Sequence, residues 1–316
     1  MPAPSDTKTH AKTVPPELGG KQLDGVVRAL WSLPWTKARA MVQRGKVALD
    51  GAVVTELERR VKAGQSIDLD PARPSPKHKD DLGGSAIVHL DAHVVVVRKP
   101  SGISTVPYDE REQGTLDERV RAILAKRSGG GARPSLGVVH RIDKETSGLV
   151  VFTRSWLAKQ SLSKQFRDHT TERRYLAIVH GVARDRTHRS HLIADRGDGL
   201  RGSFEARARK SPRVEGQLAV THVRVLERGQ GATLVECRLE TGRTHQIRIH
   251  LSEAGHPLVG ERVYIRGYGG QQIAAPRLML HAATLGFEHP ATGEHVSFED
   301  PMPDDMADVW ARLRAV

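Results

Sequence analysis

Hydrophobic residues from about residue 85 onward occur in short runs of strand length. The clearest runs are HVVVVRK, LGVVH, GLVVFT, RYLAIVHG, THVRVLE and ATLVECRLE, which are separated by polar and glycine-containing segments. Short apolar or alternating runs bounded in this way are typical of β-strands. Helices are expected over 114–126, 155–168 and 245–254. Because the strands mostly follow one another, with helices placed irregularly, the pattern predicts an α+β fold with a mixed, mainly antiparallel central sheet.

The front of the chain has a different pattern. Its first residues contain many Pro, Lys and Thr and few apolar side chains, so we expect a disordered tail there. From Leu23 the sequence predicts a short helix, a turn at 32–34, a second helix over 36–43 and then short strands, which together make a small α+β module. A following segment concentrates Pro, Gly and charge, as linkers do. The predicted division is tail 1–20, module 21–70, linker 71–84 and main domain 85–316.

Composition and charge narrow the classes of function. The chain has 316 residues, 38% of them hydrophobic, and a formal net charge of +12, which favours a polyanionic partner such as nucleic acid or a membrane surface. No apolar run reaches 18 residues, and the first twenty residues lack the apolar centre of a secretory signal. We therefore expect a cytoplasmic protein without a membrane partner. The single cysteine, Cys237, allows neither an internal disulfide nor a thiolate metal site.

A polar loop interrupts two apolar runs in GVVHRIDKETSGLVVF, residues 137–152. The loop places Asp143 at the end of a predicted sheet, where a rigid scaffold commonly holds functional groups. Asp143 and Lys144 could equally be ordinary turn residues. Two later segments, 171–181 and 240–264, bear on whether this loop is a functional site.

The first of these segments, TERRYLAIVHG, is predicted to be an alternating strand with Tyr175, Ala177 and Val179 on one face. A tyrosine at the start of a strand is commonly a packing residue, so Tyr175 is a candidate site residue only in combination with others.

The second segment is predicted to be a loop followed by a helix, with Thr244 as N-cap and Gly255 as the stop. On this helix Arg248 follows a core-facing position and can point from the edge of the core toward a cleft. His245 and His250 are five residues apart, which is not the spacing that lets two histidines share a metal ion on one helix face. We therefore expect no metal site.

Four segments in this order resemble the RluA-type pseudouridine synthases, and the resemblance extends over nearly all of residues 85–316. They are HRIDKETSGLVVFTRS, RRYLAIVHG, LETGRTHQIRIHLSEAGHPLVGERVY and RLMLHAATLGFEHPATGE. Residues 22–69 resemble, more weakly, the S-four type RNA-binding module, although the arginine usual before Leu23 is missing.

The resemblance implies that the protein isomerises uridine in RNA by detaching the base from its ribose, turning it and rejoining it through carbon five. Asp143 matches the essential aspartate of the family, which attacks the ribose or the base or assists glycal formation. Arg248 matches the arginine that pairs with it, with Arg243 as a second choice. Tyr175 matches a tyrosine that stacks on the base, and Arg141 a residue that enters the RNA to displace the target nucleotide.

The resemblance also sets the expected partners. RNA is the expected partner, ribosomal RNA of the large subunit before transfer RNA, and the protein is expected to be a monomer. An isomerisation consumes no reagent, so no cofactor is expected. Four basic residues of the front module are expected to contact the RNA backbone: Lys37, Arg39, Arg44 and Lys46. The alternative is that these residues form an ordinary solvated surface.

Two rival hypotheses come from the class of binding proteins. One is an RNA-binding or ribosome assembly factor that keeps the fold without turnover, which the intact set of Asp143, Tyr175 and Arg248 argues against. The other is a DNA-binding or repair protein, which rests on the basic charge alone.

Overall fold

The computed structural model describes two units of the chain. The residues described are 10–55, 59–73, 82, 84–108, 112–129, 134–206 and 216–314. The chain divides into a front unit, Met1–Asp81, and a larger unit, Leu82–Val316, and each is described by itself. Most of the predicted linker, together with residues 1–9, lies outside the described residues.

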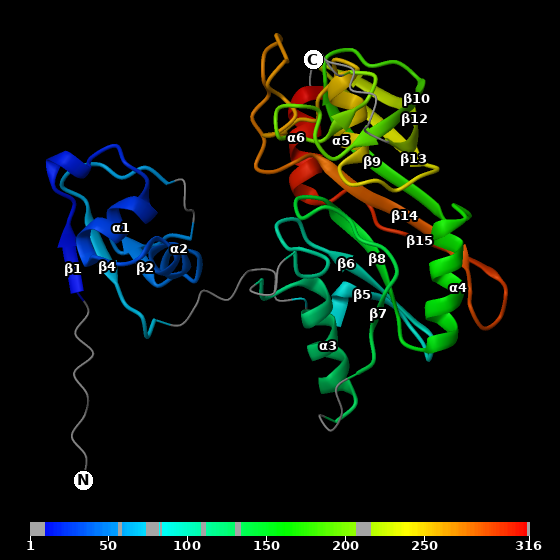
Figure 1. Cartoon of the computed structure of the whole chain (residues 1–316), viewed down its shortest axis with the longest axis horizontal. Helices are drawn as coiled ribbons and strands as arrows, with labels where there is room; N and C mark the ends of the chain where they lie inside the picture. The colour runs from blue at the N-terminus through cyan, green and yellow to red at the C-terminus, as the bar shows by residue number, and fades with distance from the viewer. Residues whose placement is uncertain are drawn as a thin grey trace. The chain divides into compact units, whose positions relative to one another are not determined.

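In its described residues the front unit is a four-stranded antiparallel sheet with two α-helices (Figure 1). The strand order is β1-β4-β2-β3. The apolar faces of the helices and strands share one core, which includes Leu23, Val27, Val42 and Ile67. The helices and strands predicted for this unit are therefore present. Their bounds are β1 His10–Thr13, α1 Leu23–Trp31, α2 Trp35–Gln43, β2 Val47–Leu49, β3 Ala52–Val53 and β4 Ser66–Leu69.

The predicted tail is wrong for residues 10–18. His10–Thr13 forms strand β1, paired antiparallel with β4, and Pro16–Leu18 forms a short 3-10 helix. Val14 is buried, and its N–H donates to the carbonyl oxygen of Gln65. A strand at the edge of a sheet is held mainly by its backbone hydrogen bonds, so its polar sequence gave no hydrophobic pattern to predict it from.

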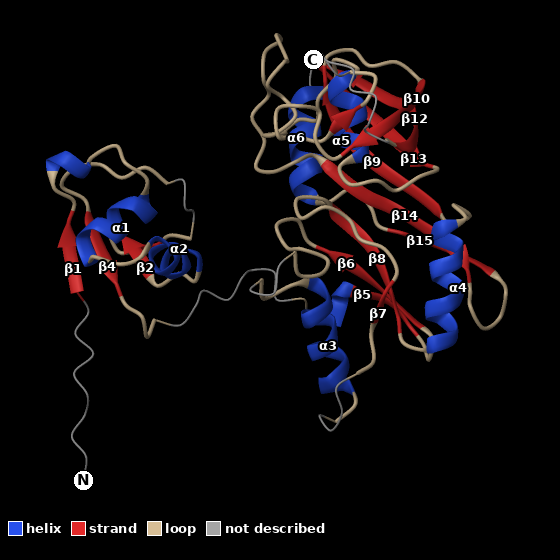
Figure 2. Ribbon diagram, in the orientation of Figure 1, coloured by secondary structure: helices blue, strands red, loops and turns tan. Residues whose placement is uncertain are grey.

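The larger unit is built on one 11-stranded sheet of its described residues (Figure 2). Its main path is β11-β10-β12-β13-β9-β14-β8-β6-β5, with β15 paired to β14 and β7 to β8. Within the described residues the one parallel pairing joins β8 and β14. The predicted α+β class with a mixed, mainly antiparallel sheet is confirmed. The strands are β5 Ile87–Leu90, β6 Val94–Lys99, β7 Gly137–Val138, β8 Ser147–Thr153, β9 Glu172–His180, β10 Arg186–Ile193, β11 Gly202–Ser203, β12 Gln217–Gly229, β13 Ala232–Leu239, β14 Leu280–Glu288 and β15 His295–Glu299.

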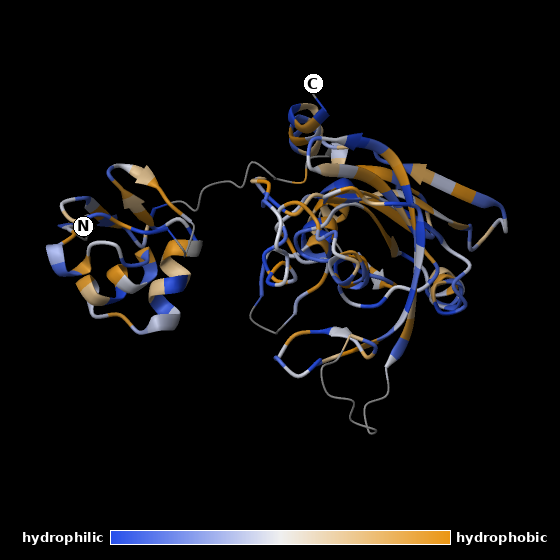
Figure 3. Ribbon diagram, turned by 90° about the horizontal axis from the view of Figure 1, so that it is seen from above, coloured by the Kyte–Doolittle hydropathy of each residue, from blue (hydrophilic) through white to orange (hydrophobic). Residues whose placement is uncertain are grey.

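Helices cover both faces of this sheet, which explains why its strands read as nearly continuous apolar runs. Alternate residues of one strand enter different cores: Val95 and Val97 of β6 belong to a core that includes residues of α3 and α5, whereas Val94 and Val96 belong to a core that includes residues of α4. Hydrophobic residues accordingly lie along the central strands (Figure 3). The helices are α3 Leu116–Arg127, α4 Trp156–Arg167, α5 Gln246–Glu253 and α6 Asp304–Arg314. No helix in the described ranges combines the length and apolar character needed to cross a bilayer.

The last helix, α6, was not predicted. It buries Met306, Val309 and Trp310 in a core with Ile178 of β9. Three apolar residues at helical spacing among charged ones make a weak pattern, and the helix depends on packing against the sheet.

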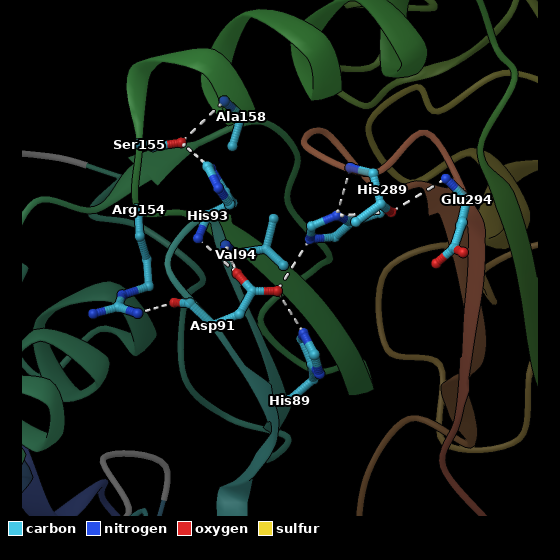
Figure 4. A network of polar contacts seen from close by, with 10 residues as sticks. His89, Asp91, His93, Val94, Arg154, Ser155, Ala158, His289 and Glu294 are labelled. Atoms are coloured by element: carbon cyan, nitrogen blue, oxygen red, sulfur yellow. Dashed lines mark hydrogen bonds and ion pairs between the residues drawn. The ribbon is translucent and has the colours of Figure 1, made fainter.

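A polar cluster around Asp91 joins three parts of the larger unit that are distant in sequence (Figure 4). The Asp91 carboxylate accepts hydrogen bonds from Nε2 of His89 at 2.7 Å and from Nε2 of His289 at 3.0 Å. His93, two residues on, bonds through Nδ1 to Oγ of Ser155 at 3.0 Å, and Ser155 is the N-cap of α4. The cluster thereby connects the β5–β6 turn, the start of α4 and the β14–β15 loop.

Candidate active site

The loop that carries Asp143 is held in place by the segment that follows β6. The Thr105 hydroxyl donates to the carbonyl oxygen of Ile142 at 3.0 Å and accepts from its N–H at 3.2 Å. Ile142 itself is buried in the main core, and the Thr146 N–H donates to the carbonyl oxygen of Asp143 at 3.1 Å. Asp143 therefore sits on a backbone that is fixed on both sides.

Lys99 is the central side chain of this arrangement. It is 1% exposed, and its Nζ donates to the carbonyl oxygens of Pro100, Ile103 and Lys144 at 3.0, 2.8 and 2.9 Å. Burial lowers the pKa of Lys99 to about 7, against the opposing charges of Glu145 and Asp143. Three carbonyl oxygens replace the water that this ammonium group would otherwise bind, and they tie the Asp143 loop to the end of β6.

Arg248 lies between two carboxylates. Its Nε and Nη2 donate to both oxygens of Glu261, each at 2.8 Å, and its Nη1 lies 3.6 Å from Oδ2 of Asp143. The side chain of Arg248 is 6% exposed, that of Glu261 1% and that of Asp143 21%. The bidentate pair fixes the plane of the guanidinium. Its third nitrogen is thereby directed to the aspartate.

The charge states of this triad follow from its contacts. Burial by itself would lower the pKa of Arg248, but the hydrogen bonds and charge of Glu261 and the charge of Asp143 raise it above its ordinary value. Burial by itself would raise the pKa of Glu261, but the bond from Arg248 and backbone N–H groups holds it below its usual range. Both groups are therefore ionised at neutral pH, and the pair presents a fixed cation to Asp143.

The start of helix α5 differs from the prediction. Thr244 is not the N-cap: the helix begins at Gln246, after His245, whose φ of 59° lies in the left-handed region. Oε1 of Gln246 accepts from the N–H of Arg243 at 3.0 Å and from the Thr241 hydroxyl at 2.7 Å. These bonds hold the segment that leads into the helix, and no described side chain caps the N–H groups of its first turn. The predicted stop is confirmed, because Gly255 follows the helix with φ 84°.

Tyr175 is on β9, on the predicted face with Ala177 and Val179. Burial raises the pKa of its hydroxyl to about 12, with Arg173 opposing this and Asp143 adding to it. The phenol therefore stays protonated. Arg173, two residues earlier on the same face, donates to the carbonyl oxygen of Glu240 at 2.8 Å. A Cβ at Gly242 would lie 2.5 Å from Nη1 of Arg173, so a side chain there would require the end of Arg173 to shift.

These elements enclose a cavity of about 500 Å³, which falls within the usual size range of small-ligand sites. Asp143 is the one carboxylate among the described residues that line it. Facing it are five arginines, Arg141, Arg167, Arg173, Arg243 and Arg248. A cavity with this charge suits an anionic ligand.

The structure brings together five predicted residues in this cavity: Asp143, Tyr175, Arg248, Arg141 and Arg243. Arg141 is exposed at its rim, and Nε of Arg243 donates to the carbonyl oxygen of Leu218 at 3.1 Å.

The basic residues of the front module belong to the other unit. Lys37, Arg39 and Arg44 are exposed there. Lys46 is half-buried and donates from Nζ to the carbonyl oxygen of Arg73. Nε of Arg39 pairs with the buried Asp24 at 3.0 Å.

His140, at the start of the loop, has a structural environment. Its Nε2 accepts from the N–H of Val151 at 3.0 Å, and its ring stacks on Phe166 at 4.4 Å between centroids. Burial, with the charge of Arg173, lowers the pKa of His140 to about 3, so the ring is neutral. These contacts hold the start of the loop against β8 and α4.

Several residues at the site were not predicted. They are Lys99, Arg173, His245, Glu261 and Tyr264. Arg173, His245, Glu261 and Tyr264 lie within the segments that carry the resemblance, whereas Lys99 lies outside them. The signal that could have found Glu261 is a lone acid in the apolar context PLVGERVY, where a buried carboxylate needs a cation.

Comparison with known protein families gives one match to this region. The model described as RNA pseudouridylate synthase matches residues 93–253, which include Asp143, Tyr175 and Arg248.

Relatives with similar sequences extend over almost the whole chain. The chain is 38% identical over 292 residues to the RNA pseudouridine synthase YlyB of Bacillus subtilis, covering 88% of this chain and 89% of that one. It is 37% identical to the ribosomal large subunit pseudouridine synthase D of Zymomonas mobilis, covering 94% and 95%. The enzyme of the same name from Pseudomonas aeruginosa is 33% identical, with 98% and 97% covered.

Among solved structures, human RNA pseudouridylate synthase domain containing 4 superposes with a TM-score of 0.59 and 25% identity, covering 72% of this chain and 93% of that one. Human RNA pseudouridylate synthase domain containing 1 gives a TM-score of 0.54 at 25% identity, covering 68% and 82%.

Proposed function

Because this chain belongs to the RNA pseudouridylate synthase family and is an RNA pseudouridine synthase, we propose that its substrate is large-subunit ribosomal RNA. The names of the relatives from Zymomonas mobilis and Pseudomonas aeruginosa support this target over transfer RNA. The net charge of +12 suits a polyanionic substrate of this kind. Action on ribosomal RNA would make it a cytoplasmic protein, and we expect it to act as a monomer.

Asp143 is proposed as the catalytic carboxylate. The observation that carries this assignment is its position as the one acid among the described residues lining a cavity with five arginines, 3.6 Å from Arg248. Arg248 would stabilise the negative charge that develops when the bond between the base and C1′ breaks. In the overall reaction the N1–C1′ bond breaks, C5 of uracil bonds to C1′, C5 loses its proton and N1 gains one. This rearrangement consumes no cofactor.

Tyr175 and Arg141 are proposed to handle the base. Tyr175 lines the cavity with a protonated hydroxyl, so its ring can stack on the extracted uracil while the hydroxyl helps to move the C5 proton. Arg141 is exposed at the rim, where a planar cation can fill the gap left by the displaced nucleotide. Arg243 lines the same cavity and is proposed to contact RNA phosphate.

The front module, residues 21–70, is proposed to be an S-four type RNA-binding module joined by the linker 71–84 to the catalytic domain 85–316. Its pair of helices packed on a small sheet, with exposed Lys37, Arg39 and Arg44, supports this role. Phosphate contacts of such side chains position the enzyme without reading sequence. Arg39 and Lys46 are proposed as weaker contacts, because Nε of Arg39 also pairs with Asp24 and Nζ of Lys46 also serves a backbone carbonyl.

The test combines the gene and the residue. Pseudouridines are mapped in total RNA from cells that carry the gene, lack it, or carry Asp143→Asn. We expect a large-subunit pseudouridine that disappears in both altered strains, while purified Asp143→Asn binds a large-subunit transcript as tightly as the unaltered protein.

Other outcomes have definite meanings. If the pseudouridine that disappears is in transfer RNA, the ribosomal target is refuted, whereas the assignment of the reaction stands. Unchanged turnover by Asp143→Asn would refute the assigned carboxylate. Asp91→Asn serves as the matched control, because Asp91 is an aspartate of the same unit that does not line the cavity.

A further inference from the structure

His245 has an unusual place at the edge of the cavity. It lies immediately before helix α5, lines the cavity with Asp143 and Arg248, and adopts a φ of 59°. Left-handed backbone is unfavourable for a residue with a side chain, and such conformations persist where the surroundings hold them, often at functional sites. The conformation aims the imidazole, so its contacts indicate what the site gains from it.

One edge of the imidazole is bound to Tyr264. Nδ1 of His245 lies 2.7 Å from the hydroxyl oxygen of Tyr264, and the two rings meet edge to face at 5.5 Å between centroids. Tyr264 is 5% exposed and does not line the cavity. The guanidinium of Arg248 lies 5.2 Å from the centroid of its ring, so the tyrosine lies beside the residue that faces Asp143.

This contact determines which nitrogen carries the proton. Burial raises the pKa of Tyr264 to about 12, so its hydroxyl keeps its hydrogen. His245 Nδ1 is its one hydrogen-bond partner among the described residues. A buried O–H that donated to nothing would be costly, so the hydroxyl donates and Nδ1 accepts. The neutral ring then carries its hydrogen on Nε2.

The ring is held in this neutral form. Burial lowers the pKa of His245, an effect that Asp143 opposes and Arg248 reinforces. No described residue bonds to Nε2. A neutral imidazole whose Nδ1 is occupied outside the cavity thus offers one N–H donor to whatever fills the cavity.

We propose that His245 is a substrate-contacting residue that donates a hydrogen bond from Nε2 to an oxygen of the uridine being isomerised, with Tyr264 setting its tautomer. Uridine offers acceptor oxygens on both its base and its ribose, and the cavity brings the donor to the same space as Asp143. The inference rests on the proposed reaction in this cavity and adds to it a neutral donor beside the charged groups.

Two substitutions separate the contact from the backbone role. Asparagine tolerates left-handed backbone and places a polar atom near the position of Nδ1, so His245→Asn keeps the bond to Tyr264 but removes the donor. Glutamine reaches the position of Nε2, so His245→Gln keeps a donor in the cavity. With a full-length unmodified large-subunit RNA transcript, we expect His245→Asn to lower kcat/KM about tenfold. We expect His245→Gln to recover part of the loss.

A merely structural His245 would give the reverse order, with His245→Asn active and His245→Gln impaired, and that result would overturn the proposal. The proposal is also overturned if both variants lose activity and have a lowered melting midpoint.

Tyr264→Phe is an independent test: we expect a loss of about threefold in kcat/KM, and no such loss when His245 has already been replaced by asparagine. Full additivity of the two changes would contradict the proposed link.

The controls separate this inference from the proposed function. His256→Asn changes a histidine that follows the same helix and bonds to the carbonyl oxygen of His180, outside the cavity, so its activity should match the unaltered enzyme. Asp143→Asn is assayed in parallel. If it stays active, the proposed function fails; if it is inactive while His245→Asn equals the unaltered enzyme, only the role of His245 fails.

Discussion

Asp91 and Asp143 are aspartates of the same unit with different surroundings. The Asp91 carboxylate accepts four hydrogen bonds, from His89, His289 and the N–H groups of His93 and Val94, at 2.6 to 3.0 Å. Asp143 has one ion pair, at 3.6 Å, and no hydrogen bond to its carboxylate from a described residue. Their side chains are similarly accessible, 28% and 21% exposed.

The number of hydrogen bonds that a carboxylate accepts from the fold thus distinguishes a structural aspartate from a reactive one. A saturated carboxylate stabilises the fold, since each charged hydrogen bond contributes about 1.5–3 kcal/mol. An under-coordinated carboxylate held beside a fixed cation retains lone pairs for a substrate. Under this rule, changes around Asp143 alter the reaction, and changes around Asp91 alter stability.

The largest effect is expected at Arg248. In Arg248→Lys a single ammonium group cannot bond both oxygens of Glu261 and also face Asp143. We expect the single-turnover rate to fall by about 1,000-fold, or about 4 kcal/mol of transition-state stabilisation, with the Kd for RNA little changed. Rapid-quench measurement of pseudouridine formation checks this. Arg277→Lys, which disrupts a bidentate pair with Asp305 outside the cavity, is the matched control, and equal rate losses in both variants would contradict the comparison.

A second effect is expected at Glu261, which shares features of a structural carboxylate such as Asp91 and of a reactive one such as Asp143. It is saturated like Asp91, since it accepts from Arg248 and from the N–H groups of Arg262 and Val263, yet it acts on the guanidinium that faces Asp143. Glu261→Gln loses its charge beside a buried cation, so we expect about 3 kcal/mol less unfolding free energy. Denaturant unfolding measures this. Turnover should fall too, and a stable variant with unchanged rate would remove Glu261 from the site.

The third effect tests Asp91 itself. Asp91→Asn keeps the two backbone bonds but sets an amide against the histidine donors, so we expect a loss of about 2 kcal/mol in unfolding free energy and a turnover rate like that of the unaltered enzyme. Urea unfolding and a single-turnover assay together check both parts. A variant as stable as the unaltered enzyme but slow in turnover would break the comparison.

The same variant has a predicted pH dependence. Burial by itself would raise the pKa of Asp91, but the bonds from His89, Val94, His93 and His289 hold it well below its ordinary value of 3.8. A carboxyl group with a lowered pKa in the folded state stabilises the fold above its unfolded pKa and loses this contribution as pH falls below it. The stability difference between the unaltered enzyme and Asp91→Asn should therefore be constant above about pH 5 and shrink in acid.

The sequence allowed parts of this picture to be predicted, for physical reasons that differ between residues. The strands of the main sheet were predictable because both faces are buried, so that runs such as Val94 to Val97 are apolar throughout. Asp143, Tyr175 and Arg248 could be named because their segments resemble a known family. Strand β1 could not be predicted, because backbone pairing at a sheet edge needs no apolar pattern.

The partners of Arg248 were beyond prediction for a different reason. A bidentate contact to Glu261, thirteen residues away, depends on how the chain after α5 turns back, which no local pattern encodes. The same holds for the contact of Tyr264 with His245 and for the bond from the Thr241 hydroxyl to Gln246. Spacing predicts which face a side chain occupies, whereas tertiary approach determines its hydrogen-bond partner.

The smallest effect is expected at the basic residues of the front unit, which also differ in whether they have a partner. Arg39 has a structural partner, because it pairs with Asp24, which is 1% exposed. No described residue pairs with the side chains of Lys37 and Arg44. We expect Lys37→Ala and Arg44→Ala each to raise the Kd for large-subunit RNA about threefold. Each should also lower the slope of log Kd against log salt by roughly 0.7–0.9, because one phosphate contact is lost. Arg39→Ala should instead lower the melting midpoint, since it leaves a buried carboxylate unpaired. Filter binding at several salt concentrations, with thermal unfolding of the same proteins, measures both quantities. The opposite result, in which Arg39→Ala changes only the salt slope and Lys37→Ala changes only the melting midpoint, would contradict this prediction. An ion pair within the module would then not distinguish a residue that stabilises the fold from one that contacts RNA.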